Sequence, residues 1–227
     1  MVDRNPYRED RGPSLVAPIV TAIAGFGLGL WAARRRPRPR TIANTGSPER
    51  AASRRAWATA EEIQGRFSDE ASRGFMRRAI ANARKAGIEE RTGWPFGAVI
   101  VDRDGEIVGD GSNHVFANHD PTAHGEVQAI RAACAALKTI NLEGCILYSS
   151  SEPCPMCLAA AYWSGIDGIV FGALADDAAA INGFGDAFLY SEIAAPPAAR
   201  ELPVVDLLRD EAVAVLREYQ SQPGESP

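Results

Sequence analysis

Two short motifs with metal-binding side chains constrain this 227-residue chain more than any other feature. His124-Gly125-Glu126 stands at the start of one Ala-rich stretch, and Pro153-Cys154-Pro155-Met156-Cys157 stands at the start of another. Each stretch is predicted to form a helix, which places the histidine and both cysteines at helix N-termini. Two cysteines three positions apart share one helix face, and the positive end of the helix dipole favours their thiolates.

One imidazole and two thiolates make three protein ligands, the number found in catalytic zinc sites, where the fourth position stays open. His124, Cys154 and Cys157 are therefore the predicted ligands of Zn²⁺. Glu126 projects about 200° further round its helix than His124, so it need not bind the same ion. A carboxylate beside a metal-activated water accepts a proton and returns it to a leaving group. Glu126 is the predicted catalytic residue, and the pattern predicts hydrolysis at an sp² carbon that bears an amino group.

The remaining cysteines and histidines have simpler interpretations. Cys134 and Cys145 are expected to pack as small buried hydrophobic side chains, and a closed structural zinc site that includes them is the alternative. His114 and His119 are expected to form hydrogen bonds in a loop. A redox role for Cys-x-x-Cys requires a thioredoxin-like context, which the surrounding prolines do not match.

Charge divides the chain into two parts. Residues 1–66 carry a formal charge of +6, whereas residues 67–227 carry −11. A domain with this acidic balance repels phosphate backbones, and it contains no run of Lys or Arg longer than Arg77-Arg78. A small, nearly neutral substrate is expected, and a large nucleic-acid partner is disfavoured.

Residues 1–66 are predicted to be an N-terminal extension to a catalytic domain over residues 67–227. Residues 15–33 contain no charged side chain and precede the Arg-rich residues 34–40, as in a membrane anchor with its basic end in the cytoplasm. Two alternatives stay open: a secretory signal, and an upstream extension that is not synthesised. Residues 34–66 are predicted to be a basic linker. The catalytic domain is expected in the cytoplasm, with membrane contact only through residues 15–33.

The pattern of hydrophobic residues and turn signals over the acidic part predicts an α/β fold. Helices are predicted over residues 68–87, 122–137, 152–165 and 209–220. Strands are predicted over residues 94–102, 106–113, 145–150, 168–172 and 203–208. Strands that alternate with helices after an initial Asp104-Gly105 hairpin favour a three-layer α/β/α sandwich around a mixed five-stranded sheet.

Four segments resemble the zinc-dependent cytidine and deoxycytidylate deaminase superfamily, and more narrowly the bacterial guanine deaminases. They read PFGAVIV, DPTAHGEVQAIR, CILYSSSEPCPMCLAAAYW and NGFGDAFLYSEI, and the resemblance extends over about residues 67–219. Their His-x-Glu and Pro-Cys-x-x-Cys pattern is the signature of zinc nucleobase deaminases. The resemblance implies a cytidine deaminase-like fold, zinc on the three predicted ligands and proton transfer by Glu126.

The guanine branch also implies residues that bind the substrate. Asn113 and Asp186 match its base-binding positions, and a carboxylate suits the N–H donors of guanine. The family closes its pocket with an aromatic residue from the partner subunit of a domain-swapped homodimer, for which Tyr219 in the C-terminal segment is the candidate. Trp94 and Phe184 are candidates for stacking on the base, with core packing as the alternative.

Two positions depart from the family pattern. Gly125 stands where Ala is usual, and glycine costs about 1 kcal/mol of helix stability relative to Ala, so looser placement of Glu126 or a different substrate is expected. Ser151 replaces a frequent Cys that is not a ligand. Hydrolysis of guanine to xanthine and ammonia is the leading hypothesis. The alternatives are a tRNA adenosine deaminase, a nucleoside or cytosine-type deaminase, and a zinc-stabilised scaffold without activity.

Overall fold

The computed structural model describes residues 57–221. The predicted anchor over residues 15–33 and most of the predicted linker over residues 34–66 therefore lie outside the described residues. Within residues 57–221, no helix combines the length and the hydropathy needed to cross a bilayer.

Four strands form one mixed sheet in the order β2-β1-β3-β4. β1 runs antiparallel to β2 and to β3, whereas β3 and β4 are parallel. The predicted hairpin joins β1 to β2: Gly105 has a φ of +85°, and the Asp102 carboxylate accepts hydrogen bonds from the backbone N–H groups of Asp104 and Glu106. The strands are β1 (Gly97–Val101), β2 (Ile107–Ser112), β3 (Ile146–Ser151) and β4 (Gly168–Ala173).

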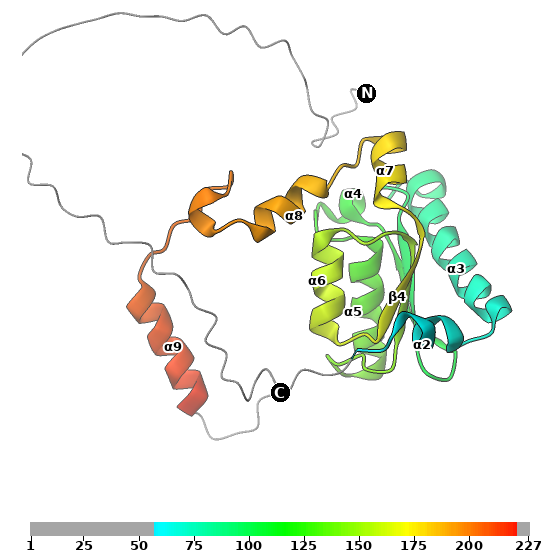
Figure 1. The fold of residues 1–227 in the computed structure, drawn as a ribbon, viewed down its shortest axis with the longest axis horizontal. Coiled ribbons are helices and arrows are strands. Elements are labelled where there is room, and N and C mark those ends of the chain that lie inside the picture. Colours follow the sequence, from blue (N-terminus) through cyan, green and yellow to red (C-terminus); the bar gives the residue numbers. More distant parts are fainter. Residues whose placement is uncertain (1–56, 222–227) are drawn as a thin grey trace, which may run out of the picture.

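Helices cover both faces of the sheet, with α5 and α6 on one side and α2 and α3 on the other (Figure 1). Both faces of β1 pack against a hydrophobic core, which explains why its sequence is an unbroken apolar run. Ala98 and Ile100 belong to the core cluster with α5 and α6, and Val99 and Val101 belong to the cluster with α2 and α3. The predicted α/β fold with a mixed sheet is confirmed. The elements of this body outside the sheet are α2 (Ala60–Gly65), α3 (Asp69–Arg84), the π-helix η1 (Lys85–Glu89), α4 (Val115–Asn118), α5 (Gly125–Leu137), α6 (Pro155–Ser164) and α7 (Ala175–Asn182).

The folded body begins before the predicted boundary at residue 67. Thr59 and Glu62 form a capping box that starts α2, and Ile63 from this helix is buried in the core. Arg66 donates a hydrogen bond of 2.8 Å to the buried Asp167 carboxylate and one of 3.0 Å to the Gly144 carbonyl oxygen. The C-terminal end of the predicted linker is therefore a helix that packs on the sheet.

The predicted fifth strand over residues 203–208 is wrong for the described chain, whose sheet has four strands. All six residues are exposed, and they lie in a segment that leaves the body, which we call the C-terminal arm (residues 187–221) (Figure 1). No strand of the described residues runs beside them, so their apolar side chains and backbone groups find no sheet to join. The arm contains α8 (Ala187–Ala194), the 3₁₀-helix η2 (Pro197–Ala199) and α9 (Arg209–Ser221).

Candidate active site

The three predicted metal ligands come together at the N-termini of two helices. His124 is the N-cap of α5 and Cys154 is the N-cap of α6, both with extended backbone, and Cys157 lies in the first turn of α6. Pro155 occupies the first turn of α6, where its fixed φ suits a helix start and its missing N–H costs no hydrogen bond. The local sequence thus presents one imidazole and two sulfurs to the same point.

The distances between these ligand atoms fit a tetrahedral zinc ion. His124 Nδ1 lies 3.6 Å from Cys154 Sγ and 3.5 Å from Cys157 Sγ. A tetrahedral ion with Zn–S bonds of about 2.3 Å and Zn–N bonds of about 2.0–2.1 Å separates its sulfur and nitrogen ligands by about 3.5 Å. All three ligand atoms lie within 4.8 Å of one another, and no fourth His, Cys, Asp or Glu joins this group among residues 57–221.

In the metal-free protein the pKa values of the two cysteines shift in opposite directions, so that Cys154 is the thiolate and Cys157 keeps its proton. The hydrogen bond from the Cys157 thiol lowers the pKa of Cys154 to about 4, with a further contribution from His124, while burial opposes the shift. The same hydrogen bond, together with burial, raises the pKa of Cys157. Burial lowers the pKa of His124, but its contact with the Cys154 thiolate outweighs burial and leaves that pKa raised. A bound metal requires both sulfurs as thiolates, so binding would release protons.

Glu126 is buried next to this cluster, in the first turn of α5. Burial is the main reason why its pKa is raised above the usual value of a glutamate. Ser149 Oγ lies 3.4 Å from Glu126 Oε1, whereas Oε2 has no hydrogen-bond partner within the described part of the chain. A buried polar atom without a partner is costly, so its presence indicates a place where a ligand binds.

Gly125 is required by close packing. A Cβ atom at this position would lie 2.8 Å from Gly97 Cα and 2.9 Å from the Phe96 carbonyl oxygen. The segment that enters β1 therefore presses directly on the start of α5. Glu126, the next residue, is only 5% exposed. Its looser placement stays a prediction.

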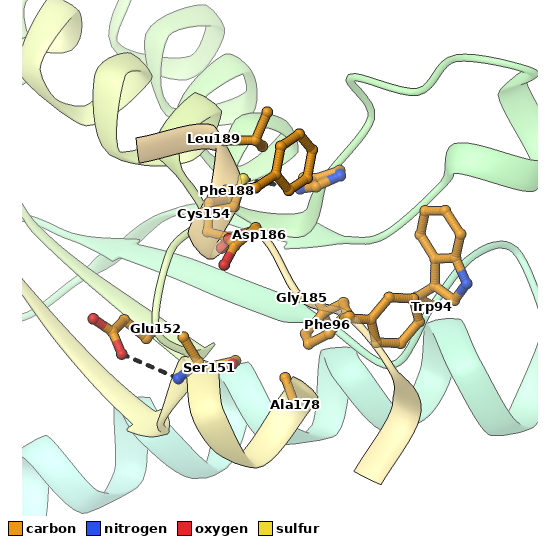
Figure 2. A pocket seen from close by; sticks show the side chains of 14 residues that line it. Trp94, Phe96, Ser151, Glu152, Cys154, Ala178, Gly185, Asp186, Phe188 and Leu189 are labelled. Atoms are coloured by element: carbon orange, nitrogen blue, oxygen red, sulfur yellow. Dashed lines mark hydrogen bonds between the residues drawn. The ribbon is translucent and has the colours of Figure 1, made fainter. Parts of the chain in front are cut away.

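A pocket opens beside Cys154 and Glu126 (Figure 2). Most of its lining is apolar, and it draws on the loop before β1, on α7 and on α8. Asp186 reaches the pocket from the loop between α7 and α8. Burial is the main reason why the pKa of Asp186 is raised, and the negative charge of the nearby Cys154 raises it further. The aromatic residues that line the pocket are Trp94, Phe96, Phe184 and Phe188.

Asn113 lies at the end of β2, fully buried, and is not itself among the lining residues. Its Oδ1 accepts hydrogen bonds from the backbone N–H groups of Trp94, at 3.3 Å, and Val115, at 3.1 Å. Its Nδ2 is buried and has no partner in residues 57–221. The side-chain oxygen is thus committed to the protein, and the side-chain nitrogen remains a donor for another molecule.

The aromatic residue, the two cysteines and the two histidines that remain from the sequence analysis do not line the pocket. Tyr219 lies on α9 and is 56% exposed. Cys145 is buried in the core with Cys134 packed against its cluster, as the hydrophobic interpretation predicted. Nδ1 of His114 lies 2.8 Å from the Ser112 carbonyl oxygen, and His119 ends α4 with left-handed backbone. Neither histidine belongs to the group of candidate metal ligands.

Glu152 is a pocket residue that the sequence interpretation missed. Its Oε2 accepts a hydrogen bond of 3.0 Å from the backbone N–H of Ala175, which starts α7 (Figure 2). Glu152 thereby ties the segment before Cys154 to the helix that forms one wall of the pocket. Its position two residues before a predicted ligand was the available signal, but the partner on α7 depends on the fold.

Comparison with known proteins places this geometry in a family. The model of the cytidine and deoxycytidylate deaminase zinc-binding region matches residues 69–173. Guanine deaminase from Bacillus subtilis (strain 168) is 43% identical over 147 residues, which cover 65% of this chain and 92% of the relative. The tRNA-specific adenosine deaminase from Aquifex aeolicus (strain VF5) is 44% identical over 100 residues, which cover 44% of this chain and 64% of that protein.

A solved structure gives the same result. The X-ray structure of guanine deaminase from Bacillus subtilis matches with a TM-score of 0.65 and 39% sequence identity, covering 71% of this chain and 99% of that chain. The similarity includes the segments that hold His124, Cys154 and Cys157, and the match to the zinc-binding region includes Glu126 as well. This chain belongs to the cytidine and deoxycytidylate deaminase zinc-binding family.

Proposed function

We propose that this protein is a zinc-dependent guanine deaminase that converts guanine and water to xanthine and ammonia. The observation that carries the proposal is the arrangement of three ligand atoms at zinc-binding distances beside a buried carboxylate oxygen without a partner. The similarity to a guanine deaminase over most of that relative's length supports the substrate.

His124, Cys154 and Cys157 would hold the zinc ion, which supplies a water molecule activated at neutral pH when it is bound. Glu126 Oε2 would accept a proton from the water that attacks the amino-bearing carbon of the base. Glu126 then delivers that proton to the amino nitrogen, and the C–N bond breaks to release ammonia. Burial keeps Glu126 away from bulk water, so the proton stays within the site.

Two residues would bind the purine. Asp186 lines the pocket, and its carboxylate can accept hydrogen bonds from the N–H donors of guanine. Asn113 Nδ2 is a buried donor without a partner in the described chain, suited to an acceptor on the base. Because Asn113 Oδ1 already accepts two backbone hydrogen bonds, the amide has one orientation.

We also propose a homodimer in which the C-terminal arms are exchanged. The arm exposes large apolar side chains on both of its α-helices and between them. Exposed apolar surface of this extent is typical of a protein interface. In such a dimer Tyr219 of one subunit would reach the pocket of the other. Light scattering of the purified chain tests this, and a monomer at micromolar concentration would contradict it.

The proposed membrane anchor over residues 15–33 calls for a separate test. The uncharged run and the arginines after it support the proposal. Cell fractionation is expected to place the full chain in the membrane fraction and a chain without residues 1–56 in the supernatant. Recovery of the full chain in the supernatant would overturn the anchor.

The activity itself is tested by ammonia release from the purified, zinc-loaded chain. Guanine, guanosine, adenine, cytosine, cytidine and a tRNA anticodon stem-loop are offered in parallel. We expect guanine to react fastest, with xanthine and ammonia in equal amounts, and we expect Asp186→Ala to lose this activity while it keeps its zinc. Faster turnover of any other substrate, or no turnover with one equivalent of zinc bound, would contradict the proposal.

A further inference from the structure

The loop that carries Asp186 has few backbone contacts of its own. It connects α7 to α8 through residues 183–186, and Gly183 ends α7 with left-handed backbone at a φ of +72°. Within residues 57–221, neither Phe184 nor Gly185 forms a backbone hydrogen bond. A Cβ atom at Gly185 would have no neighbour within 4 Å. The carbonyl oxygen of Asp186 accepts a hydrogen bond from the N–H of Leu189 in α8, but no backbone hydrogen bond of the described chain joins this loop to the segment before β1, so side-chain contacts must hold it there.

The ring of Phe184 provides that support. It lies between two other rings, with its centroid 5.3 Å from that of Trp94 and 5.5 Å from that of Phe96. Both pairs have an interplanar angle of 71°, which is the edge-to-face geometry that aromatic pairs favour. Phe184 precedes Asp186 by two residues, so the two contacts fix the loop close to the carboxylate.

Trp94 belongs to a segment before β1 that hydrogen bonds and a ring contact hold in place. Its backbone N–H donates to Asn113 Oδ1, and its ring lies 5.0 Å from that of Phe116. Thr92 secures the same loop: its hydroxyl donates to the Asn113 carbonyl oxygen at 2.8 Å, and its own carbonyl oxygen accepts from the N–H of Phe116 at 3.0 Å. Trp94 thus touches both proposed base-binding segments, one through its main chain and the other through its indole.

We infer that Trp94 is a positioning residue for Asp186: its indole clamps Phe184 against Phe96 and thereby holds the Asp186 carboxylate where the base binds. The inference deepens the proposed function and rests on it for the identity of the base. It assigns Trp94 a role other than direct stacking on the substrate. Because the contact with Asn113 uses the main chain, replacing the side chain removes the clamp and leaves that hydrogen bond.

A double-mutant cycle separates positioning from direct contact, because residues that act through one another are not additive. The variants are Trp94→Leu, Asp186→Asn and the double variant, each as the full zinc-loaded chain. Trp94→Phe is the conservative replacement. Trp57→Leu is the matched control, since Trp57 also packs edge-to-face on another ring, Tyr162 at 5.2 Å, but does not line this pocket.

Calorimetry with 8-azaguanine, a guanine analogue, measures the Kd of each variant in a Glu126→Gln background in which hydrolysis is blocked, and steady-state kinetics with guanine measures KM and kcat in the Glu126 protein. Trp94→Leu is expected to raise the Kd and the KM roughly tenfold and to change kcat less, as expected for lost aromatic contacts that fix a binding residue. Trp94→Phe is expected within about threefold of wild type, and Trp57→Leu is expected unchanged. In the Asp186→Asn background, Trp94→Leu is expected to change the Kd by less than about twofold. An equal tenfold loss in both backgrounds would show direct stacking and overturn the inference.

Hydrogen exchange of the ligand-free protein tests the clamp without any substrate. Trp94→Leu is expected to speed exchange in peptides that cover residues 183–190, and Trp57→Leu is expected to leave it unchanged. Unchanged exchange in Trp94→Leu would overturn the inference even if guanine is the substrate. If the wild type neither binds nor deaminates guanine, the proposed function fails, and the exchange result still decides whether Trp94 holds the loop.

Discussion

The body and the C-terminal arm of this molecule treat their apolar residues in opposite ways. In the body, β1 is buried on both faces, and each face belongs to a core cluster. In the arm, Val205, Leu207 and Leu216 are more than two-thirds exposed. Apolar area removed from water stabilises a fold by about 25 cal/mol per Å², so the body gains stability within one chain and the arm does not. The body brings its candidate metal ligands together within one chain, whereas the exposed apolar surface of the arm is what the proposed homodimer would bury.

The sharpest test of the body is Glu126→Gln. The amide keeps the size of the side chain but cannot accept the proton, so we expect kcat for guanine to fall roughly 10²- to 10⁴-fold. Zinc content, measured by atomic absorption, is expected to stay at one equivalent because Glu126 is not a ligand. Glu143→Gln, at an exposed position before β3, is the control and is expected to keep full activity. Substantial activity in Glu126→Gln would remove the residue from the mechanism.

Removing the arm after α8 tests the role of the arm. A chain that ends at residue 194 keeps α8 and loses α9 and the apolar segment before it. We expect it to bind one equivalent of zinc, to become monomeric and to lose roughly tenfold or more in kcat/KM for guanine, since the pocket loses its proposed aromatic closure. A chain shortened only by residues 222–227 is the control. Full activity in the monomeric chain would show that the body and α8 of one subunit make the site.

The proton distribution at the sulfurs predicts selective alkylation of the metal-free body. With the pKa of Cys154 at about 4 in the folded state, its thiolate predominates at pH 6, whereas an ordinary cysteine with a pKa of about 8.5 is almost fully protonated there. We expect iodoacetamide at pH 6 to modify Cys154 roughly tenfold faster than Cys145, whose pKa is raised by burial. Mass spectrometry identifies the site, and added zinc is expected to protect it.

The lowered pKa of Cys154 also determines how the stability of the metal-free fold depends on pH. A lowered folded-state pKa stabilises the metal-free fold above the unfolded value, and this contribution is lost as the pH falls towards the folded value of about 4. Cys154→Ser is therefore expected to lose its difference from wild type as the pH is lowered. Equal alkylation of Cys154 and Cys145 would show that the sulfur is an ordinary thiol.

The smallest expected effect concerns the packing at the start of α5. Gly125→Ala improves helix propensity by about 1 kcal/mol, but its methyl group would meet Gly97 and Phe96 at less than 3.0 Å. Overpacking of this kind costs about 1–3 kcal/mol, so we expect a net loss of unfolding free energy in urea. Gly74→Ala on α3 is the matched control, because a Cβ there meets nothing within 4 Å and is expected to stabilise. A gain in Gly125→Ala would contradict the packing account.

The sequence predicted the metal site better than it predicted the substrate pocket. Helix-start signals and ligand chemistry are local, so His124, Cys154 and Cys157 could be named from their motifs alone. The hairpin followed from its turn residues, and the mixed sheet followed from strands that alternate with helices. The close packing of Gly125 against Gly97 could not be predicted, because the two residues are distant in sequence.

The C-terminal arm shows where local patterns fail. Residues 203–208 have the composition of a strand, but a strand needs a neighbour, and none of the described residues provides one. Glu152 and the ring contact between Trp94 and Phe184 likewise depend on segments that only the fold brings together. Tyr219 was assigned to the pocket by resemblance, and within one chain it lies on the exposed α9.

X-ray absorption at the zinc edge of the purified chain tests the central claim most directly. The account predicts two sulfur ligands at about 2.3 Å and two nitrogen or oxygen ligands at about 2.0 Å, one of which is the water that the proposed reaction consumes. Three or four sulfurs bound to the zinc would mean that the metal is closed off by protein and that this body does not carry out the hydrolysis.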